Sequence, residues 1–215
     1  MKNDAKLDGK KISIPPTLLY TVLGDHKDVR KAVSSDFKDK GDVIYILGET
    51  HQELGASELS FMLSEETGGG IGNDAPQIDT TRNLAMYRAL TAAMGEGLVR
   101  SAHDCSDGGL AVAVAECCFG CDGATTINLD TVVNDNVDEW AALFGESLGR
   151  ILVSVRPEDA DSFESAMTGN AITRIGTVDD KKTLQFTIGD KTILKANIGT
   201  LLASWKGTLN MGGGE

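Results

Sequence analysis

The feature that most constrains this chain is the stretch 98–120, in which a polar, glycine-containing turn joins two apolar segments. The first segment has the composition of a short buried strand, and the second has that of an almost wholly apolar helix. Between them lies the turn Asp104-Cys105-Ser106-Asp107-Gly108-Gly109. We expect Ser106 or Asp107 to cap the helix, while the amides near Gly108 and Gly109 stay unpaired and point outward. Such amides bind anions, so the stretch predicts a phosphate site.

The charge of the chain restricts what accompanies that phosphate. The sequence has 32 acidic and 20 basic side chains and a net charge of -12. Because no Lys/Arg cluster forms a basic stripe, we expect no nucleic-acid partner. An acidic chain that binds phosphate needs local backbone dipoles and a divalent cation. Asp104 is therefore the candidate magnesium ligand, and Ser106 is the candidate phosphate donor.

Length and composition indicate a globular protein. With 215 residues and 41% apolar content, the chain suits one domain, or one domain with an extra segment. Its apolar runs are much shorter than a membrane span, and Met1-Lys2-Asn3-Asp4 contains no apolar signal core. We therefore expect a cytoplasmic protein without a membrane partner.

Residue periodicity predicts the order of strands and helices. Besides the opening strand of stretch 98–120, strands are expected at 43–47, 123–129, 150–155, 172–178, 184–188 and 192–194. Besides the helix of that stretch, helices are expected at 55–64, 79–97, 137–144, 157–167 and 198–205. The core-facing side of helix 79–97 is expected to consist of Leu84, Tyr87, Leu90, Met94 and Leu98. Strands separated first by helices and later by turns predict an α+β (mixed α/β) fold, a mixed sheet covered by helices.

The first 40 residues do not resemble the start of a self-contained domain. A turn, a short extended piece and an extended crossing are expected at Asp8-Gly9, Ile12-Ser13-Ile14 and Pro15-Pro16. Residues 17–23 are apolar enough to need a neighbour, and 28–37 predict a weak helix or turn. We expect the compact domain to span 41–215.

Two further motifs each have a functional and a structural interpretation. The glycine run at 68–72 suggests a phosphate loop, but it lacks the Lys-Ser/Thr pair and follows no strand, so a mobile surface loop is favoured. His103 is a candidate general base, although a structural histidine at a strand end is the favoured interpretation. The sequence alone leaves both alternatives open.

The four cysteines, Cys105, Cys117, Cys118 and Cys121, suggest either a metal site that includes His103 or a set of buried thiols. The chain has no paired C-x-x-C knuckle, and Cys117 and Cys118 lie in an apolar helical run. Reduced, buried thiols without disulfides are therefore the favoured interpretation.

A second polar segment, Gly145-Glu146-Ser147-Leu148-Gly149-Arg150, lies between a predicted helix and a predicted strand. In the functional interpretation the glycines allow a tight turn, Ser147 and its amide hold an anion, and Arg150 adds positive charge. In the alternative, the segment is an ordinary helix end with a solvated Arg150. Both interpretations remain open at this point.

The residue order His103-Asp104-Cys105-Ser106-Asp107-Gly108-Gly109-Leu110 resembles the signature in the C-terminal part of the phosphoribosylformylglycinamidine synthase family. Further stretches agree in order: Ile14-Pro15-Pro16-Thr17-Leu18-Leu19, Asp28-Val29-Arg30-Lys31-Ala32-Val33, Gly48-Glu49-Thr50, Glu53-Leu54-Gly55, Glu146-Ser147 and Gly149-Arg150. The resemblance implies an aminoimidazole ribonucleotide synthetase C-terminal-like domain at 41–215. It also implies that 1–40 is the tail of a preceding ATP-binding-type domain and its connector.

The resemblance further implies a role in the ATP- and glutamine-dependent amidation of formylglycinamide ribonucleotide, a C–N bond-forming ligase reaction of purine biosynthesis. By position in the motif, Asp104 is implied as a magnesium ligand. Ser106 is implied as a contact to the phosphates of ATP or ADP, and Glu146 and Ser147 match in position a loop that contacts substrate in the first half of the enzyme. Together with Gly108 and Gly109 of the turn, these are the expected cofactor-binding residues. No catalytic residue is expected, because the catalytic histidine of that family belongs to another domain, so the isolated chain should be catalytically silent.

The implied partners are the remaining domains of the same synthase, a glutaminase domain or subunit, and the purine nucleotide substrate; a homodimer is a further candidate assembly. The alternative hypothesis is a stand-alone nucleotide-binding module with a structural or regulatory role, which dimerises through its apolar N-terminal segment. Nucleotide titration of the wild type and of an Asp104 variant distinguishes the two.

Overall fold

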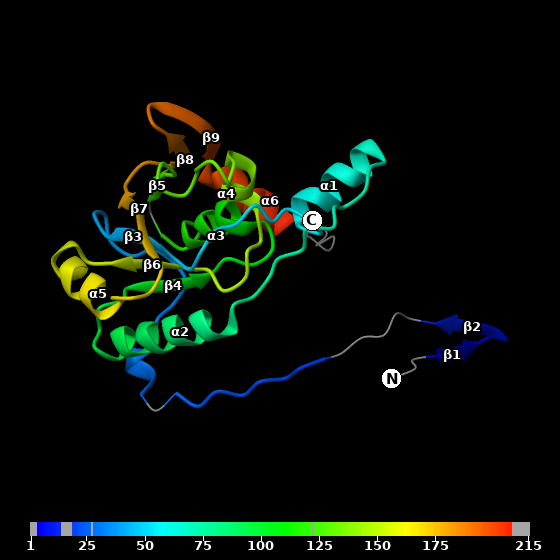
Figure 1. The fold of residues 1–215 in the computed structure, drawn as a ribbon, viewed down its shortest axis with the longest axis horizontal. Helices are drawn as coiled ribbons and strands as arrows, with labels where there is room; N and C mark the ends of the chain where they lie inside the picture. The colour runs from blue at the N-terminus through cyan, green and yellow to red at the C-terminus, as the bar shows by residue number, and fades with distance from the viewer. Residues whose placement is uncertain (1–3, 14–18, 27, 122, 208–215) are drawn as a thin grey trace, which may run out of the picture. The chain divides into compact units, whose positions relative to one another are not determined.

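The computed structural model describes residues 4–13, 19–26, 28–121 and 123–207, which belong to two compact units (Figure 1). The first unit ends at Ala32 and contains an antiparallel hairpin of β1 (Asp4–Leu7) and β2 (Lys10–Ser13). Asp8 and Gly9 have φ of 50° and 79° there, which confirms the predicted turn. Pro15-Pro16 lies outside the described residues.

The rest of the first unit has little regular structure. Only a 3-10 turn, η1 (Val29–Lys31), forms where a weak helix or turn was expected over 28–37. Leu19, Tyr20, Val22 and Leu23 are between 80% and 94% exposed. Within this chain, the described apolar residues of 17–23 therefore find no burial.

The second unit, from Val33 onward, contains a seven-stranded sheet in the order β4-β6-β3-β7-β5-β8-β9. Its strands are β3 (Val43–Leu47), β4 (Ser101–Asp104), β5 (Ala124–Asn128), β6 (Ile151–Val155), β7 (Ile172–Asp179), β8 (Thr183–Ile188) and β9 (Lys191–Asn197). Its helices are α1 (Glu58–Thr67), α2 (Thr80–Gly95), α3 (Gly109–Cys117), α4 (Glu139–Phe144), α5 (Ala160–Ala166) and α6 (Ile198–Gly207), with a 3-10 turn η2 (Pro157–Asp159). β5 and β8 pair in parallel, whereas the other neighbouring strands are antiparallel. The predicted mixed α+β fold is confirmed.

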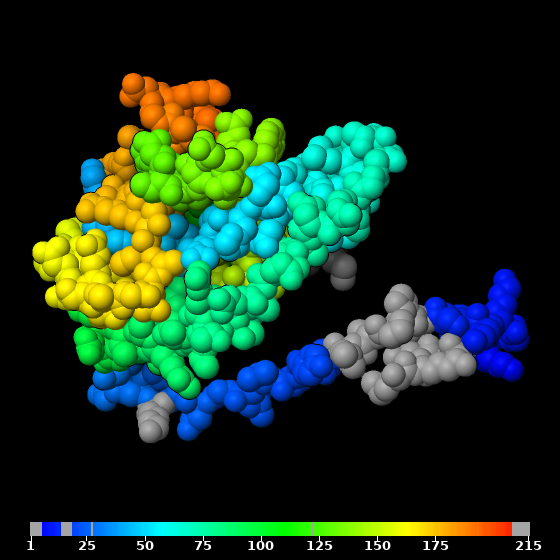
Figure 2. Space-filling model, in the orientation of Figure 1, coloured from blue at the N-terminus to red at the C-terminus, as the bar shows by residue number. Residues whose placement is uncertain are grey.

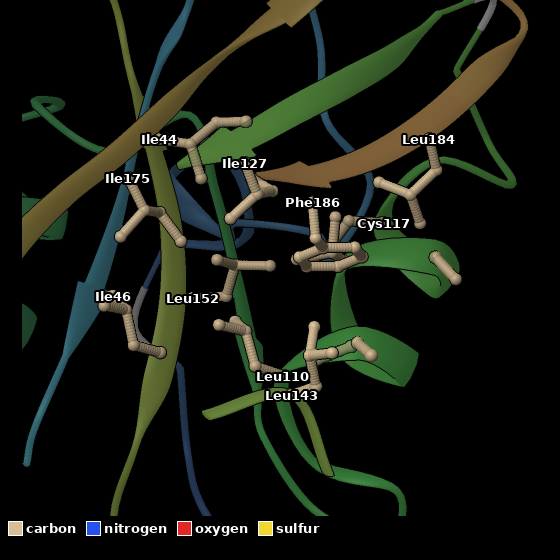
Figure 3. Packing of buried hydrophobic residues seen from close by; sticks show 14 of the residues in the cluster. Ile44, Ile46, Leu110, Cys117, Ile127, Leu143, Leu152, Ile175, Leu184 and Phe186 are labelled. Atoms are coloured by element: carbon tan, nitrogen blue, oxygen red, sulfur yellow. The ribbon is translucent and has the colours of Figure 1, made fainter. Parts of the chain in front are cut away.

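The central strand β3 shows why both faces of the sheet are covered. All five of its residues are buried, and successive side chains of a strand point to opposite faces. Ile44 and Ile46 join a core cluster with residues of α3 and α4, whereas Val43, Tyr45 and Leu47 join one with residues of α2 and α5. Figure 3 shows Leu110 of α3 within the first cluster. The sheet is therefore the middle of three layers, with α3 packed on one face.

Helix α2 begins where the sequence predicted, but it is rotated about its axis. Its buried residues are Met86, Leu90 and Ala93, whereas Leu84 and Tyr87 are 49% and 39% exposed. The predicted core stripe is confirmed for Leu90, which is buried, and for Met94 and Leu98, which are partly buried against the same cluster, and it is wrong for Leu84 and Tyr87. Met86 and Ala93 form an equally apolar stripe at helical spacing, and the small Ala93 allows close approach to the sheet.

Helix α1 also differs from expectation. It begins at Glu58 because Ser57 caps it, its Oγ accepting a hydrogen bond from Ser60 N. No residue of α1 is buried, and Figures 1 and 2 show this helix, coloured cyan, protruding from the sheet. Its apolar side chains Phe61, Met62 and Leu63 are between 45% and 52% exposed.

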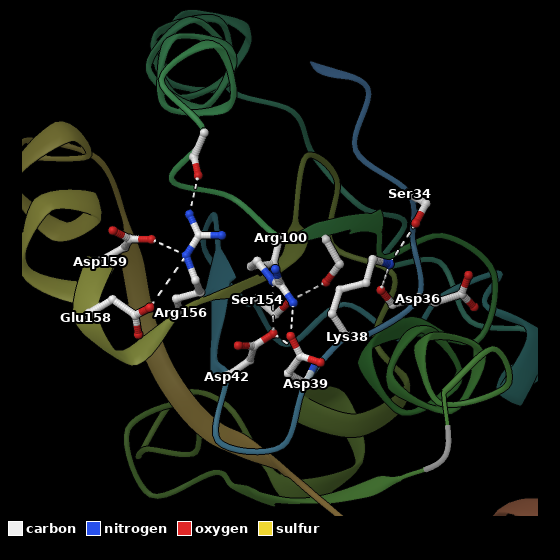
Figure 4. Close-up of polar contacts among 12 residues, drawn as sticks. Ser34, Asp36, Lys38, Asp39, Asp42, Arg100, Ser154, Arg156, Glu158 and Asp159 are labelled. Carbon is white, nitrogen blue, oxygen red and sulfur yellow. Dashed lines mark hydrogen bonds and ion pairs between the residues drawn. The ribbon is translucent and has the colours of Figure 1, made fainter. Parts of the chain in front are cut away.

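Residues 33–42 are part of the second unit and precede β3. Phe37 is 2% exposed and donates its amide to Cys117 O, while Ser34 O accepts a hydrogen bond from Ala102 N of β4. Arg100 forms ion pairs with Asp39 and Asp42 (Figure 4). None of the helices in the described parts of the chain is both long and apolar enough to cross a bilayer.

Candidate functional site

The turn between β4 and α3 depends on two adjacent glycines. Gly108 and Gly109 have φ of +78° and +66°, in the left-handed region that glycine adopts most readily. A Cβ on Gly109 would lie 2.5 Å from Gly145 O. The turn therefore packs backbone to backbone against the end of α4, which brings the two polar segments of the sequence together.

Glu146 joins the beginnings of two helices. Its Oε1 accepts hydrogen bonds from Gly108 N at 2.8 Å and from Glu58 N at 2.9 Å. The first-turn amides of α3 and α1 lack partners within their own helices and carry partial positive charge, so a carboxylate is stabilised between them. Glu146 thus holds in place the turn in front of α3.

This arrangement corrects the expectation that the amides of Gly108 and Gly109 face outward. Gly108 N donates to Glu146, Gly109 N donates to Ser106 O at 3.0 Å, and both glycines are buried. The physical reason is that a carboxylate and a carbonyl of the chain itself satisfy the donors that a phosphate was expected to use.

The predicted cap of α3 is also wrong. Gly108 occupies the N-cap position, and no side chain caps the helix. Ser106 instead donates its hydroxyl hydrogen bond to Asp104 Oδ2, and the left-handed backbone of the two glycines turns Asp107 away from the capping position. Asp104, Ser106 and Asp107 are all exposed.

Ser147 and Arg150 differ from both interpretations offered for their segment. Ser147 is 0% exposed, and its Oγ accepts a hydrogen bond from His51 N at 3.0 Å, so it reaches no ligand in this arrangement. Arg150 is 1% exposed and donates to Ser147 O and Thr50 Oγ1, both at 3.2 Å, and to Gly145 O. Arg150 is therefore neither solvated nor presented to an anion; it fixes the loop 145–149.

These two segments line a cavity of about 500 Å³. Its wall includes Asp104, Ser106, Asp107, Glu146, Gly149 and Arg150. Tyr87 lies on the same wall. The sequence did not indicate this position, because Tyr87 falls at helical spacing with apolar residues and was therefore predicted to face the core. Three carboxylates against one buried arginine give the residues of the wall a net negative charge.

A second cavity of about 520 Å³ shares Leu148 with the first. It is lined in part by Glu49, His51, Arg82 and Asn83, with Asn83 packed against Gly149. In the sequence, only the polar residues 49–52, which follow β3, pointed to this second cavity. The pairing of His51 with Ser147 joins that run to the loop 145–149.

His103 lies between two carboxylates. Its Nε2 is 2.9 Å from Glu116 Oε2 on α3, and its Nδ1 is 3.3 Å from Asp104 Oδ1. The ring is outside the lining of the 500 Å³ cavity, so its role here is to connect β4 with α3 and orient Asp104. This agrees with the structural interpretation.

The described residues contain no group of three or more His, Cys, Asp or Glu side chains that would enclose a metal ion. All four cysteines carry free thiols; Cys105, Cys117 and Cys118 are buried, and Cys121 is half-buried. Burial raises the pKa of the Cys105 thiol to about 11.

The hydrogen bond from Ser106 lowers the pKa of Asp104 below its ordinary value. A depressed carboxyl pKa stabilises the fold above the unfolded-state pKa, and this stabilisation is lost as the pH falls through the folded-state pKa. We expect Ser106→Ala to raise the pKa of Asp104 toward the ordinary value of an aspartate. Carboxyl-carbon NMR titration measures it, with Ser64→Ala on α1 as the remote control. An unchanged pKa in Ser106→Ala would contradict this assignment.

Comparison with known proteins identifies the family to which this chain belongs. Residues 39–189 match the family described as AIR synthase related protein, C-terminal domain. Phosphoribosylformylglycinamidine synthase II from Thermotoga maritima has a similar structure, with a TM-score of 0.67 and 19% identity over 80% of this chain and 28% of that chain. T. maritima PurL complexed with FGAR is similar with a TM-score of 0.68 and 20% identity, over 80% of this chain and 29% of that chain. Hydrogenase maturation protein HypE in complex with ATP is similar with a TM-score of 0.55 and 17% identity, over 79% of this chain and 55% of that chain.

The solved structures share the fold with this chain at low sequence identity. The chain spans less than a third of the length of the synthase structures that it matches. The family match extends from the residues before β3 to the end of β8, and so includes both polar segments of the cavity. The chain belongs to the AIR synthase related family, of which it carries the C-terminal domain.

Proposed function

We propose that this chain is the C-terminal domain of a phosphoribosylformylglycinamidine synthase and that its 500 Å³ cavity forms one wall of a nucleotide site. The observation that carries the proposal is the cavity in which Asp104 and Ser106, at the end of β4, lie opposite the loop that holds Glu146. Structures of T. maritima PurL complexed with ATP, ADP and AMPPCP support nucleotide binding by relatives of this fold. Similarity to PurL complexed with FGAR supports the choice of synthase.

In this proposal the whole enzyme performs the ATP- and glutamine-dependent amidation of formylglycinamide ribonucleotide. Its other parts are the remaining synthase domains and a glutaminase domain or subunit, and the enzyme works in the cytoplasm. Residues 1–40 are the tail of the preceding ATP-binding-type domain with its connector, and 41–215 are the C-terminal domain that carries the cavity. This chain supplies contacts to the nucleotide and no catalytic side chain.

The charge of the cavity decides the form in which nucleotide binds. Asp104, Asp107 and Glu146 line the wall with one buried cation, Arg150, so a free triphosphate is repelled. Mg²⁺ binds proteins through one or two carboxylates together with phosphate oxygens and water. Exposed Asp104 fits as such a single ligand, and the metal would supply charge neutralisation of the phosphates.

Ser106 is the second proposed contact, and the other residues of the two polar segments hold the wall in its shape. Ser106 carries an exposed hydroxyl, whose hydrogen would turn from Asp104 to a phosphate oxygen, and Gly109 allows the close approach of α3 to the end of α4. Glu146 holds the two helix beginnings, and Ser147 holds the chain at His51. Only Asp104 and Ser106 are proposed as direct contacts.

Titration calorimetry of the synthase that contains this domain, with AMPPCP and Mg²⁺, tests the site, because the proposal places the other wall in the remaining domains. We expect Asp104→Asn to weaken binding about tenfold or more, since losing a hydrogen bond or contact to a charged group costs about 1.5–3 kcal/mol and 1.4 kcal/mol is tenfold. Asp161→Asn on α5 makes the same charge change far from the cavity wall and should bind like the wild type. Equal affinities for all three proteins, or undiminished binding without Mg²⁺, would contradict the assignment.

The isolated chain should not turn over. With formylglycinamide ribonucleotide, ATP, Mg²⁺ and ammonium, we expect no amidine and no ADP above the protein-free background, because this wall offers contacts but no assigned catalytic group. Product formation measured by chromatography would contradict this part of the proposal while leaving the nucleotide site intact.

A further inference from the structure

The segment Cys118-Phe119-Gly120-Cys121 forms a turn directly after α3. The ends of a four-residue turn lie within about 7 Å of each other between Cα atoms. A disulfide bridges Cα atoms about 4.4–6.8 Å apart. The backbone after α3 therefore places Cys118 and Cys121 at a spacing that a disulfide can close.

The two thiols differ in access. Cys121 folds back on the turn, since its Sγ lies 3.5 Å from Cys118 O and 3.3 Å from Gly123 O. Cys118 is 0% exposed, whereas Cys121 is half-buried. One sulfur is thus reachable from solvent, and the other lies behind it.

The electrostatics of the pair favour ionisation of the accessible thiol. Donation from the Cys118 thiol lowers the pKa of Cys121 to about 6, and the same interaction, with burial, raises the pKa of Cys118. Burial raises the pKa of neighbouring Cys117 as well. Because the thiolate is the nucleophile in disulfide exchange, reactivity is expected at Cys121 rather than at the buried thiols.

We propose that Cys118 and Cys121 form a thiol–disulfide exchange site that takes a low-molecular-weight disulfide such as oxidised glutathione. The Cys121 thiolate attacks one sulfur of that disulfide, breaks its S–S bond, and releases one glutathione thiolate. Cys118 then gives its proton to the released thiolate, and its sulfur displaces the second glutathione from Cys121. Two protein thiols are oxidised to one intrachain disulfide, and one glutathione disulfide is reduced to two thiols.

Closure of this disulfide has a local optical reporter. Phe119, between the two cysteines, packs on Trp205 of α6 with ring centroids 5.7 Å apart. Both rings line an apolar cleft of about 240 Å³ between α3 and α6. In the reduced chain the Cys121 thiol contacts two carbonyl oxygens, and forming the disulfide breaks these contacts. We therefore expect the turn to shift and the fluorescence of Trp205 to change. Trp140 packs on Phe144 and supplies a constant background.

The test incubates the reduced chain with oxidised glutathione, alkylates the remaining thiols after unfolding, and maps the peptides by mass spectrometry. We expect a Cys118–Cys121 disulfide, alkylated Cys105 and Cys117, and a fluorescence change that dithiothreitol reverses. A disulfide between another pair, a lasting glutathione adduct on wild-type Cys121, or no reaction would each overturn the proposal.

Single variants separate the two roles. Cys118→Ala should accumulate a glutathione adduct on Cys121, because the resolving sulfur is gone, whereas Cys121→Ser should form neither adduct nor disulfide. Cys117→Ala is the matched control and should oxidise like the wild type. An adduct on Cys118 in Cys121→Ser would overturn the assignment of the attacking sulfur. If Cys118→Ala fails to fold, the wild-type peptide map alone decides.

Discussion

Replacing Gly109 by Ala is expected to lower the free energy of unfolding by about 2–5 kcal/mol. The left-handed backbone at this position, with φ of +66°, costs an L-residue about 1–2 kcal/mol. The added Cβ would also lie 2.5 Å from Gly145 O and 2.9 Å from Phe144 C, both rigid backbone atoms. Forcing such contacts adds about 1–3 kcal/mol. Urea unfolding followed by circular dichroism measures the change.

Gly97→Ala is the matched control for that experiment. Gly97 also has a left-handed φ, +78°, but no atom lies within 4 Å of its hypothetical Cβ. Its expected cost is the backbone penalty alone, about 1–2 kcal/mol. Equal losses of stability in the two variants would contradict the close packing of α3 against the end of α4, on which the geometry of the cavity depends.

Replacing Arg150 by Ala is expected to destabilise the chain by about 3–5 kcal/mol. The side chain is 1% exposed and donates to Ser147 O, Thr50 Oγ1 and Gly145 O. Its removal leaves buried acceptors without a donor, which costs about 1–3 kcal/mol for each unsatisfied group, and opens a cavity. Thermal and urea unfolding report the loss, and the calorimetric nucleotide titration reports the accompanying distortion of the loop 145–149.

Arg82→Ala supplies the comparison with an exposed arginine. Its side chain is 69% exposed and pairs with Glu49 Oε1 at 2.7 Å. Exposed ion pairs contribute about 0–1 kcal/mol, so this variant should be nearly as stable as the wild type. A loss below about 1 kcal/mol in Arg150→Ala would show that the arginine does not hold the loop.

The sequence predicted the elements whose signals are local. β3 is rich in β-branched and aromatic residues and ends at Leu47, just before Gly48, and Asp79 caps α2 by accepting hydrogen bonds from Thr81 N and Arg82 N. The bounds of β3 agree with the prediction, and those of α2 differ from it by no more than about two residues. Helix α1, predicted over 55–64, instead spans Glu58–Thr67. The rotation of α2 could not be predicted, because two apolar stripes compete and tertiary packing on the sheet chooses between them.

The candidate site was only partly predictable for the same reason. The strand-turn-helix pattern of the sequence predicts that Asp104 and Ser106 lie in the exposed turn between β4 and α3. The pairing of Glu146 with Gly108 N joins residues 38 positions apart, and no local pattern encodes it. The burial of Arg150 likewise depends on the packing of residues 48–53 against the loop 145–149. Sequence patterns thus predict which residues form the turn, while the fold decides which of its donors remain available.

The most direct test of the proposed nucleotide wall is an amide NMR titration of the isotope-labelled chain with AMPPCP and Mg²⁺. We expect shifts that cluster at residues 104–107 and at the loop 145–149, that require Mg²⁺, and that disappear in Asp104→Asn. Shifts that cluster around Arg82 and His51 in the second cavity, or no shifts at millimolar nucleotide, would contradict the proposed wall.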